Sequence, residues 1–222
     1  MRFPKQIFAR SPAVARVAPF VIFLALTFFQ GKFGAASAYW FYLAKTLAGA
    51  WLVWEMRPFV SEMRWAFSWE AILVGVGIFA VWVGLDSFYP HPMKSGATGN
   101  PGDVFGDGSA LAGFFIAAHI LGMTFVVPPL EEVFYRSFLY RYLASQNFLA
   151  VPLNQFSPFP FFATAIVFGF SHNEWLAGIL CGAAYQWLVL RKNRLGDAMT
   201  AHAITNFLLG AWIVWKHAWN FW

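Results

Sequence analysis

Residues 110–130, ALAGFFIAAHILGMTFVVPPL, form an apolar run that is long enough to cross a lipid bilayer as a helix. A spanning helix needs about 20 mostly apolar residues, and this run contains no Asp, Glu, Lys or Arg. The run therefore predicts a membrane-spanning helix, and the rest of the sequence can be compared with it.

The whole chain has the composition of a membrane protein. Of its 222 residues, 59% are hydrophobic, 21% are aromatic and 11% are charged, whereas soluble domains average about 25% charged residues. This excludes an ordinary soluble globule and a disordered chain. We expect an all-α polytopic bundle of about seven to eight spans, because six further apolar runs occur at residues 17–29, 39–54, 71–85, 159–170, 176–190 and 198–215.

Basic residues indicate the orientation of these runs. With the amino terminus inside, eleven Lys and Arg residues fall on inner segments and three on outer ones, as the positive-inside rule requires for a cytoplasmic amino terminus. The basic start followed by residues 17–29 is read as an uncleaved signal anchor, with a cleaved signal peptide as the alternative. Residues 89–108 form a long polar outer loop. The net charge of +5 is assigned to topology and not to a nucleic-acid partner.

The first polar group stands in PPLEEVFYR, residues 128–136. The two prolines are expected to break the incoming helix and to begin a new one. Glu132 and Arg136 then lie four residues apart on one face and can form an ion pair. Glu131 is turned about 100° away from Glu132 and is free for other partners.

Two further polar groups follow within or beside apolar runs. Phe168 and His172 are one helical turn apart, and so are His202 and Asn206. An ionisable side chain in hydrocarbon costs at least about 2.5 kcal/mol, so each one requires a reason. Hydrogen bonds that only join helices are one reason. A glutamate with a histidine can also form a general base, and a second histidine with an amide can bind an oxyanion.

In this order, Glu-Glu-x-x-x-Arg, Phe-x-x-x-His and His-x-x-x-Asn resemble the three motifs of the type II CAAX prenyl endopeptidase and bacteriocin-immunity (CPBP) family of intramembrane proteases. The resemblance runs from Glu131 to Asn206, so residues 109–222 are expected to form the protease core. Residues 1–108 match only in being hydrophobic, and are expected to supply amino-terminal helices and the polar loop. The short, aromatic-rich chain is also similar to bacterial CAAX prenyl protease-related proteins, some of which accompany exosortase systems.

The resemblance implies a role for each motif residue. Glu131 and His172 would activate a water molecule, while His202 and Asn206 would stabilise the tetrahedral oxyanion. Three further residues would support this arrangement, namely Glu132, Arg136 and Phe168.

The resemblance also favours a glutamate-dependent mechanism without a cofactor. The alternative is zinc bound by Glu131, His172 and His202. The sequence contains no His-Glu-x-x-His zinc motif, and these three ligands would leave no separate general base.

The expected function is an endopeptidase of the bacterial inner membrane that cleaves a membrane-anchored protein or peptide. Two alternatives are a proton-coupled transporter that uses the same residues as a relay and a non-catalytic immunity or scaffold protein. With seven full crossings, His172 falls near the outer end of its run, whereas Glu131 and His202 lie toward the inner face. Catalysis therefore requires one segment to be tilted, broken or re-entrant, which is tolerated around a hydrated cavity inside the protein.

Overall fold

The computed structural model describes residues 3–90 and 99–222. Within these ranges the chain forms helices and no strand, which confirms the all-α class. The predicted loop at residues 89–108 falls partly on residues 91–98, which lie outside the described ranges. Its described remainder includes the short helix α5 (Pro101–Phe105).

Each of the seven apolar runs overlaps a helix. The helices are α1 (Phe3–Arg10), α2 (Pro12–Thr27), α3 (Ala35–Met56), α4 (Trp69–Leu85), α6 (Ala110–Phe125), α7 (Val127–Glu132), α8 (Tyr140–Ala144), α9 (Pro158–Phe170), α10 (Trp175–Lys192) and α11 (Gly196–Lys216). A π-helical segment, Val133–Leu139, joins α7 to α8, and the short 3-10 helix η5 (Trp219–Phe221) follows α11.

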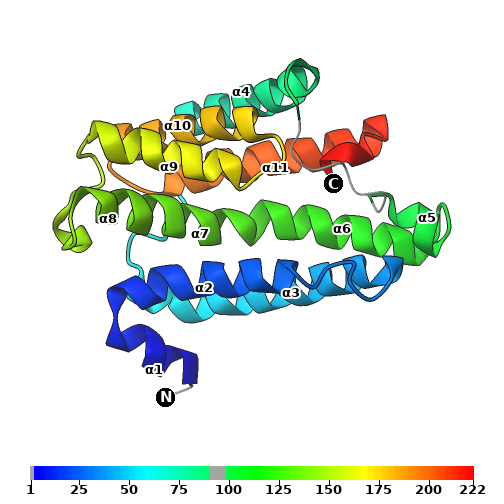
Figure 1. Cartoon of the computed structure of the whole chain (residues 1–222), viewed down its shortest axis with the longest axis horizontal. Coiled ribbons are helices and arrows are strands. Elements are labelled where there is room, and N and C mark those ends of the chain that lie inside the picture. Colours follow the sequence, from blue (N-terminus) through cyan, green and yellow to red (C-terminus); the bar gives the residue numbers. More distant parts are fainter. Residues whose placement is uncertain (1–2, 91–98) are drawn as a thin grey trace.

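The expected helix boundary at Pro128 and Pro129 is confirmed, because α6 ends at Phe125 and α7 begins at Val127 with Pro128 in its first turn, but the axis does not change direction. One long helix of 35 residues, Ala110–Ala144, runs along a single axis in Figure 1. It consists of α6, α7, the π segment and α8. The interruption is limited to Val126, with φ −102° and ψ −43°. Pro128 lies in the first turn of α7, where backbone N–H groups have no acceptor within the helix. Its missing N–H group therefore removes no helical hydrogen bond, and the axis continues.

The long helix separates the bundle into two parts (Figure 1). Helices α2 and α3 pack on one side of it and α9 and α11 on the other, while α10 packs against α9 and α11, and α4 packs against α10 and α11. The connection at residues 57–68 leads from α3 to α4 and so crosses from one part to the other. Helices α9 and α10 approach closely, because a Cβ atom on Gly178 would lie 2.9 Å from the Cα atom of Gly169. Small residues at such crossings are typical of helix pairs in membranes.

The protein is an integral membrane protein. Among the described residues, the helices Trp69–Phe88, Ala110–Ala144 and Gly196–Lys216 are long and apolar enough to cross a bilayer. Helix α9 is apolar but has only 13 residues, so it is about 20 Å long, shorter than the hydrocarbon core of about 30 Å. A short α9 explains how the Phe168–His172 turn reaches the interior of the bundle. The number of crossings stays a prediction.

Candidate active site

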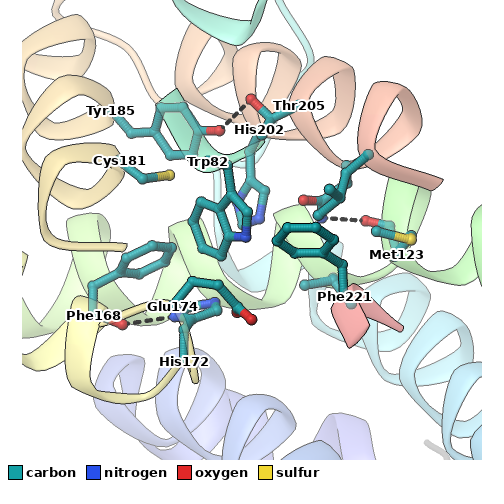
Figure 2. A pocket seen from close by; sticks show the side chains of 13 residues that line it. Trp82, Met123, Phe168, His172, Glu174, Cys181, Tyr185, His202, Thr205 and Phe221 are labelled. Atoms are coloured by element: carbon teal, nitrogen blue, oxygen red, sulfur yellow. Dashed lines mark hydrogen bonds between the residues drawn. The ribbon is translucent and has the colours of Figure 1, made fainter. Parts of the chain in front are cut away.

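A cavity of about 180 Å³ lies where α4, α6, α9, α10 and α11 meet (Figure 2). Four residues that the motifs predict line it: Phe168, His172, His202 and Asn206. They come from two motifs on different helices, so the fold brings together residues that the sequence keeps apart. Glu131, Glu132 and Arg136 are not among the lining residues.

His172 lies in the turn between α9 and α10, with its ring against the cavity. Its Nδ1 atom is 2.8 Å from the carbonyl oxygen of Phe168. A carbonyl only accepts hydrogen bonds, so Nδ1 carries the proton and, in the neutral ring, Nε2 is a proton acceptor. The rings of Phe168 and Trp82 pack on His172 at centroid distances of 4.7 and 5.4 Å and hold its orientation.

His202 belongs to a buried ion network that we call the site network, formed by Glu132, Arg136 and His202. Its Nδ1 atom lies 2.9 Å from Glu132 Oε1, and Arg136 Nε lies 3.2 Å from Glu132 Oε2. The ion pair between Glu132 and Arg136 confirms the predicted pairing. The bond to His202 crosses from α7 to α11 and was not predicted. Because a carboxylate accepts at Nδ1, the Nε2 atom of His202 is left for the cavity.

Arg136 connects the site network to the second motif. It is fully buried in the π segment, and its guanidinium carbon lies 4.4 Å from the centre of the Phe168 ring. Its Nη2 atom also donates to the carbonyl oxygen of Gly182 on α10, at 3.2 Å. Phe168 therefore packs between Arg136 and His172. A π-helical segment at this place fits the frequent occurrence of such segments at functional sites.

Asn206 lies one turn after His202 and lines the same cavity. Its Nδ2 atom donates to the carbonyl oxygen of Met123 on α6, at 2.7 Å (Figure 2). This bond fixes the amide and uses one of its two hydrogens. The second hydrogen is left to donate to another group.

Glu131 is half-buried on α7 and interacts electrostatically with Lys45 of α3. Among the described residues, no donor forms a hydrogen bond with its buried Oε2 atom. This agrees with the prediction that Glu131 is not engaged by the ion pair on its own helix. Lys45, a basic residue within a predicted span, donates to Thr27 Oγ1 at 3.0 Å and lies over the rings of Phe23 and Tyr42.

The residues proposed as zinc ligands do not gather as a metal site requires. Within residues 3–90 and 99–222, no three His, Cys, Asp or Glu side chains lie close enough together to hold an ion. The expected mechanism without a cofactor and the zinc alternative both stay predictions.

The sequence reasoning missed a second carboxylate at the cavity, Glu174. This residue is buried, lies beside His172 in Figure 2, and burial raises the pKa of its carboxyl group above the ordinary value. A signal was present, because Glu174 is an acidic residue between two apolar helices and requires a reason as much as the motif residues do. Further lining residues that were not predicted include Trp82, Tyr185, Thr205 and Phe221.

The bundle and its cavity define a helical membrane protein with a polar site enclosed among its helices. Residues 112–208 match the family model described as Type II CAAX prenyl endopeptidase Rce1-like. The match covers a little under half of the chain, includes all three motifs and confirms the resemblance that they indicate. This family implies a protease. No curated protein and no solved structure matches the chain.

Proposed function

We propose that the protein is an intramembrane endopeptidase that hydrolyses a peptide bond in a membrane-anchored protein or peptide. The observation that carries the proposal is the meeting of His172, His202 and Asn206 around one cavity in an apolar bundle. Each histidine is held through Nδ1, so that Nε2 is the nitrogen available to a substrate. Such groups can move protons and bind a developing negative charge.

In the proposed first step, Glu131 and His172 activate water. The water oxygen forms a bond with the carbonyl carbon of the substrate, and its proton passes to the Glu131 carboxylate. The acceptor Nε2 of His172, which lines the cavity, supports its part in this step. The role of Glu131, which does not line the cavity, rests on the family match and on its Oε2 atom, which has no hydrogen-bond partner among the described residues. The carbonyl oxygen becomes an oxyanion, so the step requires hydrogen-bond donors.

We assign those donors to His202 and Asn206. With both ring nitrogens protonated, His202 donates Nδ1–H to Glu132 and Nε2–H to the oxyanion. Asn206 donates the amide hydrogen that Met123 does not use. The carbon–nitrogen bond then breaks, and the proton held by Glu131 passes to the leaving amine, which leaves a carboxylate on the other product. No step uses a metal ion.

The experiment compares membranes that contain the wild-type protein with membranes that contain Glu131→Gln. Quantitative proteomics should find a cleavage product that is lost in the variant, because removing a general base lowers turnover by about 10²- to 10⁴-fold. His172→Ala and His202→Ala should lose the same product while remaining inserted and folded. Near-normal cleavage by Glu131→Gln would remove the assigned base. Flux driven by pH in liposomes without cleavage would instead support a transporter.

We also propose a bacterial inner-membrane location with a cytoplasmic amino terminus, from the excess of basic residues on the predicted inner segments. A reporter fused to the amino terminus should be protected from external protease in right-side-out vesicles and digested in inverted ones. Digestion in right-side-out vesicles would reverse the orientation.

A further inference from the structure

A second hollow lies where the connection at residues 57–68 meets the long helix and α11, and we call it the basic groove. It has a volume of about 880 Å³, and two arginines and two tryptophans line it: Arg57, Arg64, Trp54 and Trp65. Its wall also includes Pro129 and Met199. The groove therefore combines positive charge with aromatic rings next to the elements that carry the candidate site.

The two arginines of the basic groove are exposed and have no acidic partner. Among the described residues, neither Arg57 nor Arg64 forms an ion pair, and the nearby Glu62 is already bound by Arg16 and Arg141. A guanidinium group matches the geometry of phosphate oxygens. The groove therefore offers two uncompensated phosphate-binding groups.

An apolar groove of about 570 Å³ shares the lining residue Trp65 with the basic groove. It lies between α6 and α11, and its walls include Phe67, Phe125, Ile204 and Phe207. Trp65 lines both hollows, so they adjoin at this side chain. Tryptophan is enriched at the level of lipid headgroups, between the charged and the hydrocarbon layers. A ligand that follows both hollows must have an anionic head and an apolar tail.

We propose that the two grooves bind one anionic phospholipid, with its phosphate at Arg57 and Arg64 and an acyl chain along the apolar groove. Basic hollows between membrane helices are suited to anionic headgroups. A soluble anion would bind the arginines but would leave the apolar groove empty. A soluble acidic peptide would leave the apolar groove empty as well.

The bound lipid would lie next to the candidate site. Pro129 is two residues before Glu131, and Met199 is three residues before His202. Thr200 Oγ1 donates to the carbonyl oxygen of Ala66 at 2.8 Å, so the connection is already attached to α11. A bound lipid would stabilise this contact between the connection and α11 from the outside of the bundle. This inference does not depend on proteolysis.

The test measures lipid binding to the full chain in neutral detergent by native mass spectrometry. Phosphatidylglycerol and phosphatidylcholine with identical acyl chains are titrated separately. We expect Arg57→Gln/Arg64→Gln to weaken phosphatidylglycerol binding by about 30-fold, since each basic side chain near anionic lipid contributes a factor of about five. Arg191→Gln is the matched control, because Arg191 is exposed and basic but lies outside both grooves, and it should bind as the wild type does.

Three results would overturn the proposal. Equal affinity of the wild type for the two lipids would remove the role of charge. Competition by glycerol 3-phosphate at the same concentration as phosphatidylglycerol would indicate a site for free anions. Displacement of the lipid by a soluble acidic peptide would indicate a peptide site. If the double variant does not fold, as judged by circular dichroism, Arg57→Gln and Arg64→Gln are measured singly, and each should weaken binding about five-fold.

Discussion

Two buried ion networks lie along the long helix, and only the site network opens onto the cavity of Figure 2. The other, which we call the anchor network, consists of Arg16, Glu62, Ser137 and Arg141. Glu62 Oε1 lies 2.7 Å from Arg16 Nη2 and 3.4 Å from Arg141 Nη1, and it accepts a short hydrogen bond from Ser137. The anchor network joins α2, the connection at residues 57–68 and α8.

The two networks begin at neighbouring residues of the π segment. Arg136 belongs to the site network, and Ser137 belongs to the anchor network. Both networks place a glutamate against arginine in an apolar surrounding, so a buried ion pair alone does not indicate catalysis. The difference is a histidine, because His202 links the site network to a cavity and the anchor network has no such residue. Four predictions can break or sharpen this distinction.

The largest expected contrast is between Glu132→Gln and Glu62→Gln. Glu132 orients His202, and loss of the carboxylate that orients a catalytic histidine can lower turnover by about 10⁴-fold. Glu62 touches no cavity residue, so turnover of its variant should stay within about three-fold of the wild-type value. Such a loss is much smaller than the loss of about 10²-fold expected when a catalytic group is removed. The measurement is the rate at which each variant cleaves a membrane substrate, divided by the amount of folded protein. Equal losses in the two variants would show that both networks act only on folding.

Asn206 offers a smaller effect within the site. Asn206→Ala and the isosteric Asn206→Asp should each lower kcat by about 10²- to 10³-fold with little change in KM, because they remove one oxyanion donor. The measurement is steady-state kinetics in proteoliposomes. A changed KM at constant kcat would instead make Asn206 a ground-state binding residue.

For the anchor network, stability is the sensitive quantity. Glu62→Gln should lower the free energy of unfolding by about 2 kcal/mol, because it leaves two largely buried arginines without their carboxylate. Lys32→Gln is the control, since Lys32 is exposed and its removal should shift stability by less than about 0.5 kcal/mol. Thermal unfolding in detergent measures both. An unchanged melting temperature in Glu62→Gln would remove the structural role.

The smallest expected effect concerns pH. Burial alone would raise the pKa of Glu62, but the Ser137 hydrogen bond and the Arg16 charge outweigh burial and lower it. A lowered folded-state pKa means that the stabilisation is complete above the unfolded value of about 4.3 and is lost as pH falls through the folded value. The difference in melting temperature between wild type and Glu62→Gln should therefore be constant from neutral pH to about pH 5 and should shrink below it. A difference that grows in acid would contradict this.

The helices could be predicted from the sequence because hydrophobicity is local. Each apolar run defines its own helix, whatever its neighbours are. Pro128 shows the limit, since its effect depends on its place in a turn: in the first turn of α7 it leaves the axis straight.

The site could be predicted in part. The motifs identified His172, His202 and Asn206, which do meet in one cavity. The bond between Glu132 and His202 could not be predicted, because it joins residues 70 positions apart on two helices whose packing the sequence does not state. Glu174 was within reach of the same reasoning, since its charge stands out against apolar neighbours.

The π segment has a consequence for insertions and deletions. Its turns hold more residues than those of an α-helix, so the helix that follows is rotated relative to an uninterrupted one. Deleting a single residue from Val133–Leu139 and returning to α-helical winding would leave the later side chains close to their present directions, because the wider turns hold about one extra residue. The same deletion in the α-helical turns just before this segment would instead turn every later side chain by about 100°. Arg141 would then face away from the carbonyl oxygen of Val151, which its Nε atom now meets at 2.8 Å. Chain length is therefore more tightly constrained in the α-helical turns beside the π segment than within it.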